Sequence, residues 1–318
     1  MFYGGFGTSW NEARPVAVKS VLLSTLGVVI TAALTGFFCY FILKFRFLDS
    51  MLIGSVVSST DAASVFSILR SKNMGLKYGT ASMLELESGS NDPCSYMLTV
   101  VVLSAMSGTA SAGSIFYMIF AQLFFGILFG CLIAFAARFI LRHMHFDIAG
   151  FDMAFVIAVA LLSYTLPSIA GGNGYLSAYM VGIILGNTKI KNKKSLVNFL
   201  TGSPDLCRCL FSSPGPSGNT VAAPRIFLPA LAIALFLTLA ARPLAVSAIL
   251  APFKCRLNQQ VLVSFAGLRG AASIVFAIMA TVNEAYTGFD VYHIVFCIVL
   301  LSILFQGSFC PRQPKSLI

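Results

Sequence analysis

The chain has 318 residues, of which 58% are hydrophobic and only 10% are charged, and its formal net charge is +10. Ordinary soluble domains are about 45–50% apolar and about 25% charged, so this composition excludes a typical soluble protein. Lys and Arg lie in short runs between apolar stretches rather than along one stripe. We therefore interpret them as membrane topology signals and expect no nucleic-acid partner.

The apolar stretches predict an all-α polytopic membrane protein, because about 20 apolar residues in a helix cross ~30 Å of hydrocarbon. The first fifteen residues lack the layout of a cleavable signal peptide and resemble the end of a span followed by a loop. In chain order, the expected spans are 16–43, 47–69, 78–106, a span that follows the loop 107–114 and ends at Arg138 and Arg142, then 151–169, 175–186, 226–250, 259–282 and 292–307. These spans define an expected transmembrane domain over residues 1–308, followed by a tail over residues 309–318.

Residues 194–225 break this pattern, because they hold four prolines and no apolar run long enough to cross a membrane. Read literally, the segment is a loop. Lys and Arg then divide twelve to six between the two sides, whereas a crossing here would divide them fifteen to three. The positive-inside rule favours the second division, so we interpret residues 200–225 as an aberrant or damaged span, with an authentic loop as the alternative.

The eight cysteines lie mostly within apolar runs and lack metal-ligand spacing. We interpret them as small packing residues, and the pair Cys207 and Cys209 is too weak a signal for a metal site.

Three carboxylates, those of Glu85, Glu87 and Asp92, stand at the head of the span 78–106. A charged side chain at the centre of a bilayer costs at least ~2.5–3.5 kcal/mol, so such groups persist mainly where they pair, bind an ion or relay a proton. Pro93 removes a backbone donor beside them and can kink the helix. The cluster predicts an ion or proton site.

A second polar segment, Thr60 and Asp61, lies near the middle of the span 47–69 and is flanked by Ser and Ala. Such residues permit an interrupted helix, whose free carbonyls and hydroxyls can bind a bare cation. Together with Asn91, Asp92 and the hydroxyls of Ser88 and Ser90, this segment predicts a site for a monovalent cation or a proton at Asp92. The alternative is that Asp61 only forms hydrogen bonds to neighbouring helices.

Glu87 lies five residues from Asp92, so the two buried carboxylates would repel each other unless a cation neutralises one of them. We predict an ion pair between Glu87 and Arg269, because glycines flank Arg269 and let another helix approach. The alternative is that Arg269 extends to the membrane interface. Arg242 has no such context and is left unassigned.

Three segments, at 58–63, 87–93 and 267–271, resemble the signature segments of the monovalent cation:proton antiporter-1 family, and the NhaP-type bacterial potassium or sodium/proton antiporters in particular. The resemblance implies an inverted-repeat antiporter fold of about twelve or thirteen spans with crossed unwound helices, usually a homodimer in the cell inner membrane. Roughly three N-terminal spans of that pattern are missing, so we expect a fragment.

The resemblance also implies roles for single residues. Asp92 would bind cation and proton alternately, Thr60 and Asp61 would belong to the unwound crossing, Ser88 would be a possible ligand, and Glu87 with Arg269 would form the structural ion pair.

The expected function is therefore not enzymatic and needs no cofactor. It is exchange of K⁺ or Na⁺ for H⁺ by alternating access. The family analogy makes this exchange electroneutral, because Asn91 leaves one titrating carboxylate at the pair 91–92. The alternatives are a non-transporting fragment and a cation channel, although no segment resembles a selectivity filter.

Overall fold

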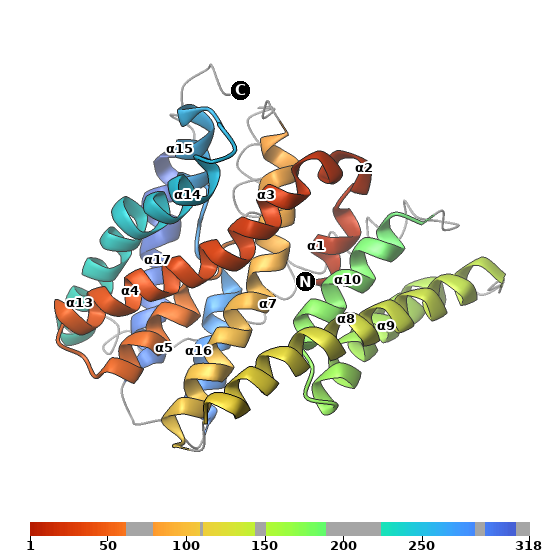
Figure 1. The fold of residues 1–318 in the computed structure, drawn as a ribbon, viewed down its shortest axis with the longest axis horizontal. Helices are drawn as coiled ribbons and strands as arrows, with labels where there is room; N and C mark the ends of the chain where they lie inside the picture. Colours follow the sequence, from red (N-terminus) through yellow and green to blue (C-terminus); the bar gives the residue numbers. More distant parts are fainter. Residues whose placement is uncertain (62–78, 109–110, 144–150, 189–223, 284–289, 310–318) are drawn as a thin grey trace. The chain divides into compact units, whose positions relative to one another are not determined.

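The computed structural model describes residues 1–61, 79–108, 111–143, 151–188, 224–283 and 290–309. Every regular element within these ranges is a helix, as predicted (Figure 1). The helices form two compact units, one built from residues 1–14 and 112–214 and the other from residues 15–111 and 215–318.

The first unit is held together by close contacts between helices that carry small residues. Its elements are α1 (Phe2–Gly7), α2 (Trp10–Ala13), α8 (Ala112–His143), α9 (Phe151–Ile169) and α10 (Gly174–Gly186). A side-chain carbon added at Gly130 of α8 would lie 3.2 Å from the Cα of Ser177 in α10. Such contacts are typical of membrane helices, where small residues let backbones approach.

The second unit repeats one order of elements twice. A long helix with a π-helical segment comes first, a helix that ends in a non-helical segment comes second, and an uninterrupted helix comes third. The first set is α3 (Ala17–Leu22), η2 (Leu23–Gly27) and α4 (Val28–Phe41), then α5 (Phe47–Val57), then α7 (Thr80–Met106). The second set is α13 (Pro224–Phe236), η3 (Leu237–Ala241) and α14 (Arg242–Leu250), then α15 (Leu257–Phe265) and α16 (Ala271–Val282), then α17 (Val291–Phe309). A 3-10 turn, η1 (Arg14–Val16), precedes α3. This recurrence agrees with the repeat expected of the antiporter fold.

Among the described residues, three helical stretches are long and apolar enough to cross a membrane: Trp10–Phe41, Ala112–His143 and Pro224–Leu250. Several shorter apolar helices accompany them. The face of α8 that includes Phe116, Phe120, Phe135 and Phe139 is exposed, as expected for a surface that contacts lipid.

Among the described residues the other helices follow the predicted spans closely, and α9 has the predicted bounds. In the predicted span 47–69, α5 ends at Val57, and residues 62–69 lie outside the described residues. The predicted span 259–282 is interrupted at residues 266–270. Pro93 lies inside α7, which remains helical on both sides of it. The predicted aberrant segment 200–225 lies outside the described residues except for its end, where α13 begins at Pro224, and residues 310–318 of the predicted tail also lie outside them.

Candidate functional site

The site is built around two non-helical segments of the second unit. Helix α5 ends at Val57 and is followed by the non-helical residues 59–61, while residues 266–270 separate α15 from α16. The backbone N–H of Asp61 donates a hydrogen bond of 2.7 Å to the carbonyl oxygen of Leu268. The two unwound segments therefore touch, as the fold prediction requires.

Arg269 holds the first unwound segment in place. Its Nη1 donates to the carbonyl oxygens of Ser58, at 2.8 Å, and Ser59, at 2.7 Å, and the residue is 1% exposed. The last carbonyls of a helix lack hydrogen-bond donors and form its negative end. A guanidinium at the end of α5 therefore supplies both the missing hydrogen bonds and a compensating positive charge. The backbone N–H of Arg269 in turn donates to Ser302 Oγ on α17 at 3.1 Å.

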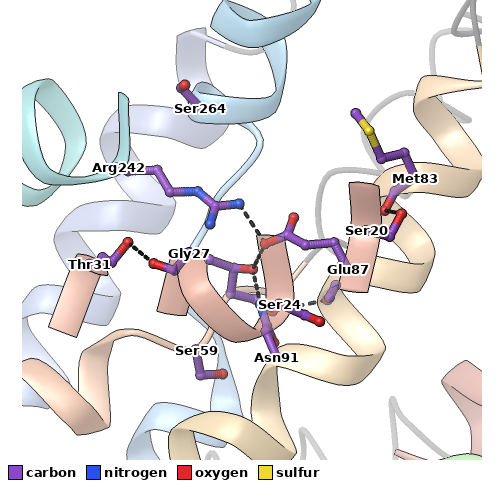
Figure 2. Close-up of polar contacts among 12 residues, drawn as sticks. Ser20, Ser24, Gly27, Thr31, Ser59, Met83, Glu87, Asn91, Arg242 and Ser264 are labelled. Atoms are coloured by element: carbon purple, nitrogen blue, oxygen red, sulfur yellow. Dashed lines mark hydrogen bonds and ion pairs between the residues drawn. The ribbon is translucent and has the colours of Figure 1, made fainter. Parts of the chain in front are cut away.

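Glu87 of α7 pairs with Arg242, so the predicted pair of Glu87 with Arg269 is wrong. Arg242 Nη2 lies 2.7 Å from Glu87 Oε1, and both side chains are 1% exposed (Figure 2). Arg242 begins α14, directly after the π segment η3. A carbon added at Gly267 would lie 2.8 Å from Arg242 Nε. Gly267 therefore leaves space for the Arg242 side chain. It does not serve a contact between Arg269 and Glu87.

Sequence reasoning missed Arg242, although one signal could have found it. Two arginines lie near the middle of predicted spans, and assigning Glu87 to Arg269 left the other without a counter-charge. A buried arginine without a partner is costly, so Arg242 needed an assignment of its own.

Four predicted site residues meet where α7 crosses the segment after α5. Ser88 Oγ donates to the carbonyl oxygen of Thr60 at 2.9 Å, and Asn91 Nδ2 donates to Thr60 Oγ1. Ser59 Oγ donates to Asp92 Oδ1. Thr60, Asn91 and Asp92 are all buried. Thr60 Oγ1 also lies 3.4 Å from Glu87 Oε1, which links the cluster to the ion pair.

Asp61, at the end of the described segment after α5, lies beside Gly270. A side-chain carbon added at Gly270 would fall on the Asp61 side chain, and Gly270 is the residue that caps the start of α16. A carboxylate beside a helix N-terminus is favoured by the helix dipole. Asp61 is partly exposed, unlike Asp92.

The arrangement concentrates oxygen atoms around one buried carboxylate. Asp92 supplies the charge, and hydroxyl and carbonyl oxygens come from Ser59, Thr60 and Ser88. Hard cations prefer such ligands, and unwound backbone is where membrane transporters supply them. A proton on the carboxylate is the other charge that this site can hold.

Comparison with known proteins gives a consistent result. The sodium/hydrogen exchanger family (transmembrane) matches residues 1–312. The K(+)/H(+) antiporter NhaP of Alkalimonas amylolytica is 33% identical over 314 residues, which cover 96% of this chain and 54% of that protein. The K(+)/H(+) antiporter NhaP2 of Shewanella sp. (strain ANA-3) is 32% identical with the same coverage. The chain thus spans about half the length of these curated relatives.

A third relative, the probable Na(+)/H(+) antiporter 2 of Methanocaldococcus jannaschii, is 28% identical over 88% of this chain and 69% of its own length. Among solved structures, the sodium proton antiporter MjNhaP1 from the same organism at pH 8 superposes with a TM-score of 0.85. The match covers 99% of this chain and 82% of that one at 22% identity, which shows a shared fold.

Proposed function

We propose that this chain, which belongs to the sodium/hydrogen exchanger family and is a multi-pass membrane protein, exchanges a monovalent cation for H⁺. The observation that carries the proposal is the buried carboxylate of Asp92, where α7 meets the non-helical segment after α5. In the described part of the chain, this carboxylate accepts one hydrogen bond, from the neutral hydroxyl of Ser59. A carboxylate of this kind can take up a cation or a proton, but it gains little from holding both.

The remaining site residues have supporting roles. Ser88 and Thr60 supply oxygen ligands, and Asn91 holds Thr60 in place through its amide. Asp61 lies beside the start of α16 and adds negative charge to the crossing. Glu87 with Arg242, and Arg269 with the carbonyls at the end of α5, tie the site to both halves of the unit.

Exchange is proposed to be electroneutral, one cation for one proton. Position 91 is an asparagine, so one of the two adjacent residues at 91 and 92 can titrate. The transported cation is K⁺ or Na⁺, since similar proteins bear the names of antiporters for each. We further propose residues 1–308 as the exchanger domain, acting as a homodimer in the plasma membrane and in contact with its lipids.

Flux measurements in proteoliposomes test this proposal. An imposed pH gradient should drive K⁺ or Na⁺ uptake against its own gradient, and Asp92→Asn should abolish the uptake while the protein stays inserted. Asp290→Asn is the matched control, because Asp290 is 40% exposed at the start of α17 and contacts His293. Cation leak without coupling would indicate a channel instead, and no flux at all would indicate a non-transporting fragment.

A further inference from the structure

Pro93 leaves one backbone carbonyl near Asp92 without its ordinary donor. Proline has no N–H, and in an α-helix the N–H of residue 93 would donate to the carbonyl of Gly89. Helix α7 runs from Thr80 to Met106 with Pro93 inside it. Hydrocarbon cannot satisfy a freed carbonyl, so membrane proteins place such groups where a polar partner can reach them.

The Gly89 carbonyl lies within reach of the Asp92 carboxylate. Side chains on a helix tilt toward its N-terminus, so that of residue i+3 lies over the carbonyl of residue i. Helix α7 shows this nearby, where Ser90 Oγ contacts the carbonyl oxygens of Leu86 at 2.5 Å and Glu87 at 3.4 Å. A cation held by Asp92 can therefore touch the Gly89 oxygen.

The residue that carries this carbonyl is also partly exposed. Ser88, Gly89 and Ser90 are partly exposed, whereas the adjoining Glu87 and Asn91 are buried. Gly89 has no side chain to cover its own carbonyl. These partly exposed residues lie two to four positions before Asp92 in α7.

The Thr60 carbonyl at the crossing is already engaged, whereas the buried Asn91 Oδ1 has no hydrogen-bond partner among the described residues. The carbonyl of Thr60 accepts from Ser88 Oγ at 2.9 Å and from Asn91 Nδ2 at 3.4 Å. A hard cation needs several oxygen ligands, and each ligand that must first give up a hydrogen bond weakens binding. Because Pro93 has no N–H, the Gly89 carbonyl need not give up a hydrogen bond to residue 93 when it binds a cation.

We propose that the Gly89 carbonyl is a direct ligand of the transported cation. Because Pro93 cannot donate a hydrogen bond to this carbonyl, it favours binding of the cation over binding of a proton at Asp92. A bound cation gains from an added carbonyl dipole, whereas a proton on Asp92 needs no further ligand. The inference deepens the proposed exchange function and rests on it.

Two substitutions at one position test the inference in the full chain. Pro93→Ala supplies the missing N–H and should raise the KM for K⁺ or Na⁺ by about tenfold, with a smaller change in kcat. A second variant carries lactic acid at position 93, introduced by nonsense suppression. It has the side chain of alanine and an ester oxygen in place of the N–H, and it should restore the wild-type KM.

Pro229→Ala is the matched control, because Pro229 lies inside α13, outside the site, and should leave the KM unchanged. A wild-type KM in Pro93→Ala would overturn the inference while exchange by the wild type still stands. Equal loss in the alanine and lactic acid variants would also overturn it, because the ring and not the N–H would then matter. Absence of coupled flux in the wild type would instead refute the proposed function, and the inference with it.

Discussion

The ion pair between Arg242 and Glu87 gives the sharpest stability prediction. Both side chains are 1% exposed and their charged atoms are 2.7 Å apart, so removing one partner leaves a buried charge without compensation. Breaking a buried pair in this way costs about 3–5 kcal/mol. Arg242→Gln should therefore unfold at a clearly lower temperature in detergent. The double variant Glu87→Gln with Arg242→Gln should recover part of the loss, with a coupling energy of up to ~3 kcal/mol.

The same comparison of single and double variants, made on Glu87 and Arg269, is the control double-mutant cycle. Arg269 donates to the carbonyls of Ser58 and Ser59, so its loss leaves oxygen atoms, and not Glu87, without a partner. The coupling energy in this second cycle should be the smaller of the two. If thermal unfolding gave the larger coupling to Glu87 and Arg269, the assignment of partners in the structure would be refuted.

Two glycine substitutions give further predictions. Gly270→Ala would place a carbon on the Asp61 side chain, so cation/proton exchange should fall by more than it does in Asp61→Asn. A flux equal to or higher than that of Asp61→Asn would show that the two segments can move apart. Gly54→Ala would press α5 against the Ala32 carbonyl of α4 and should cost about 1–3 kcal/mol of stability by thermal unfolding, whereas Gly4→Ala, with nothing within 4 Å, should cost far less.

The sequence predicts the helices well, and it locates polar residues that the structure brings together, for a clear physical reason. Hydrophobic length determines where a helix can cross the membrane, and α9 and α7 follow the predicted spans closely. Carboxylates and hydroxyls in mid-span are costly, so Thr60, Asn91 and Asp92 could be located, and the structure brings them together.

The partners of the charged groups could not be read in the same way. Depth in the membrane follows from position along a span, but the direction of a side chain depends on local helix geometry. The π segment η3 ends immediately before Arg242, and one such segment turns every following side chain relative to a regular helix. Composition gives no sign of it, so sequence analysis assigned Glu87 to Arg269 and left Arg242 without an assignment.

The observed partners of the two arginines bear on the proposed mechanism. Arg242 neutralises Glu87, and Arg269 is directed at the carbonyls at the end of α5. In the described part of the chain, no ion pair joins Asp92 to a basic side chain, and the Asp92 carboxylate accepts a hydrogen bond from Ser59. A permanent cationic partner would compete with a transported ion for this carboxylate. The charge that remains at Asp92 is a single one, as the proposal of one cation for one proton requires.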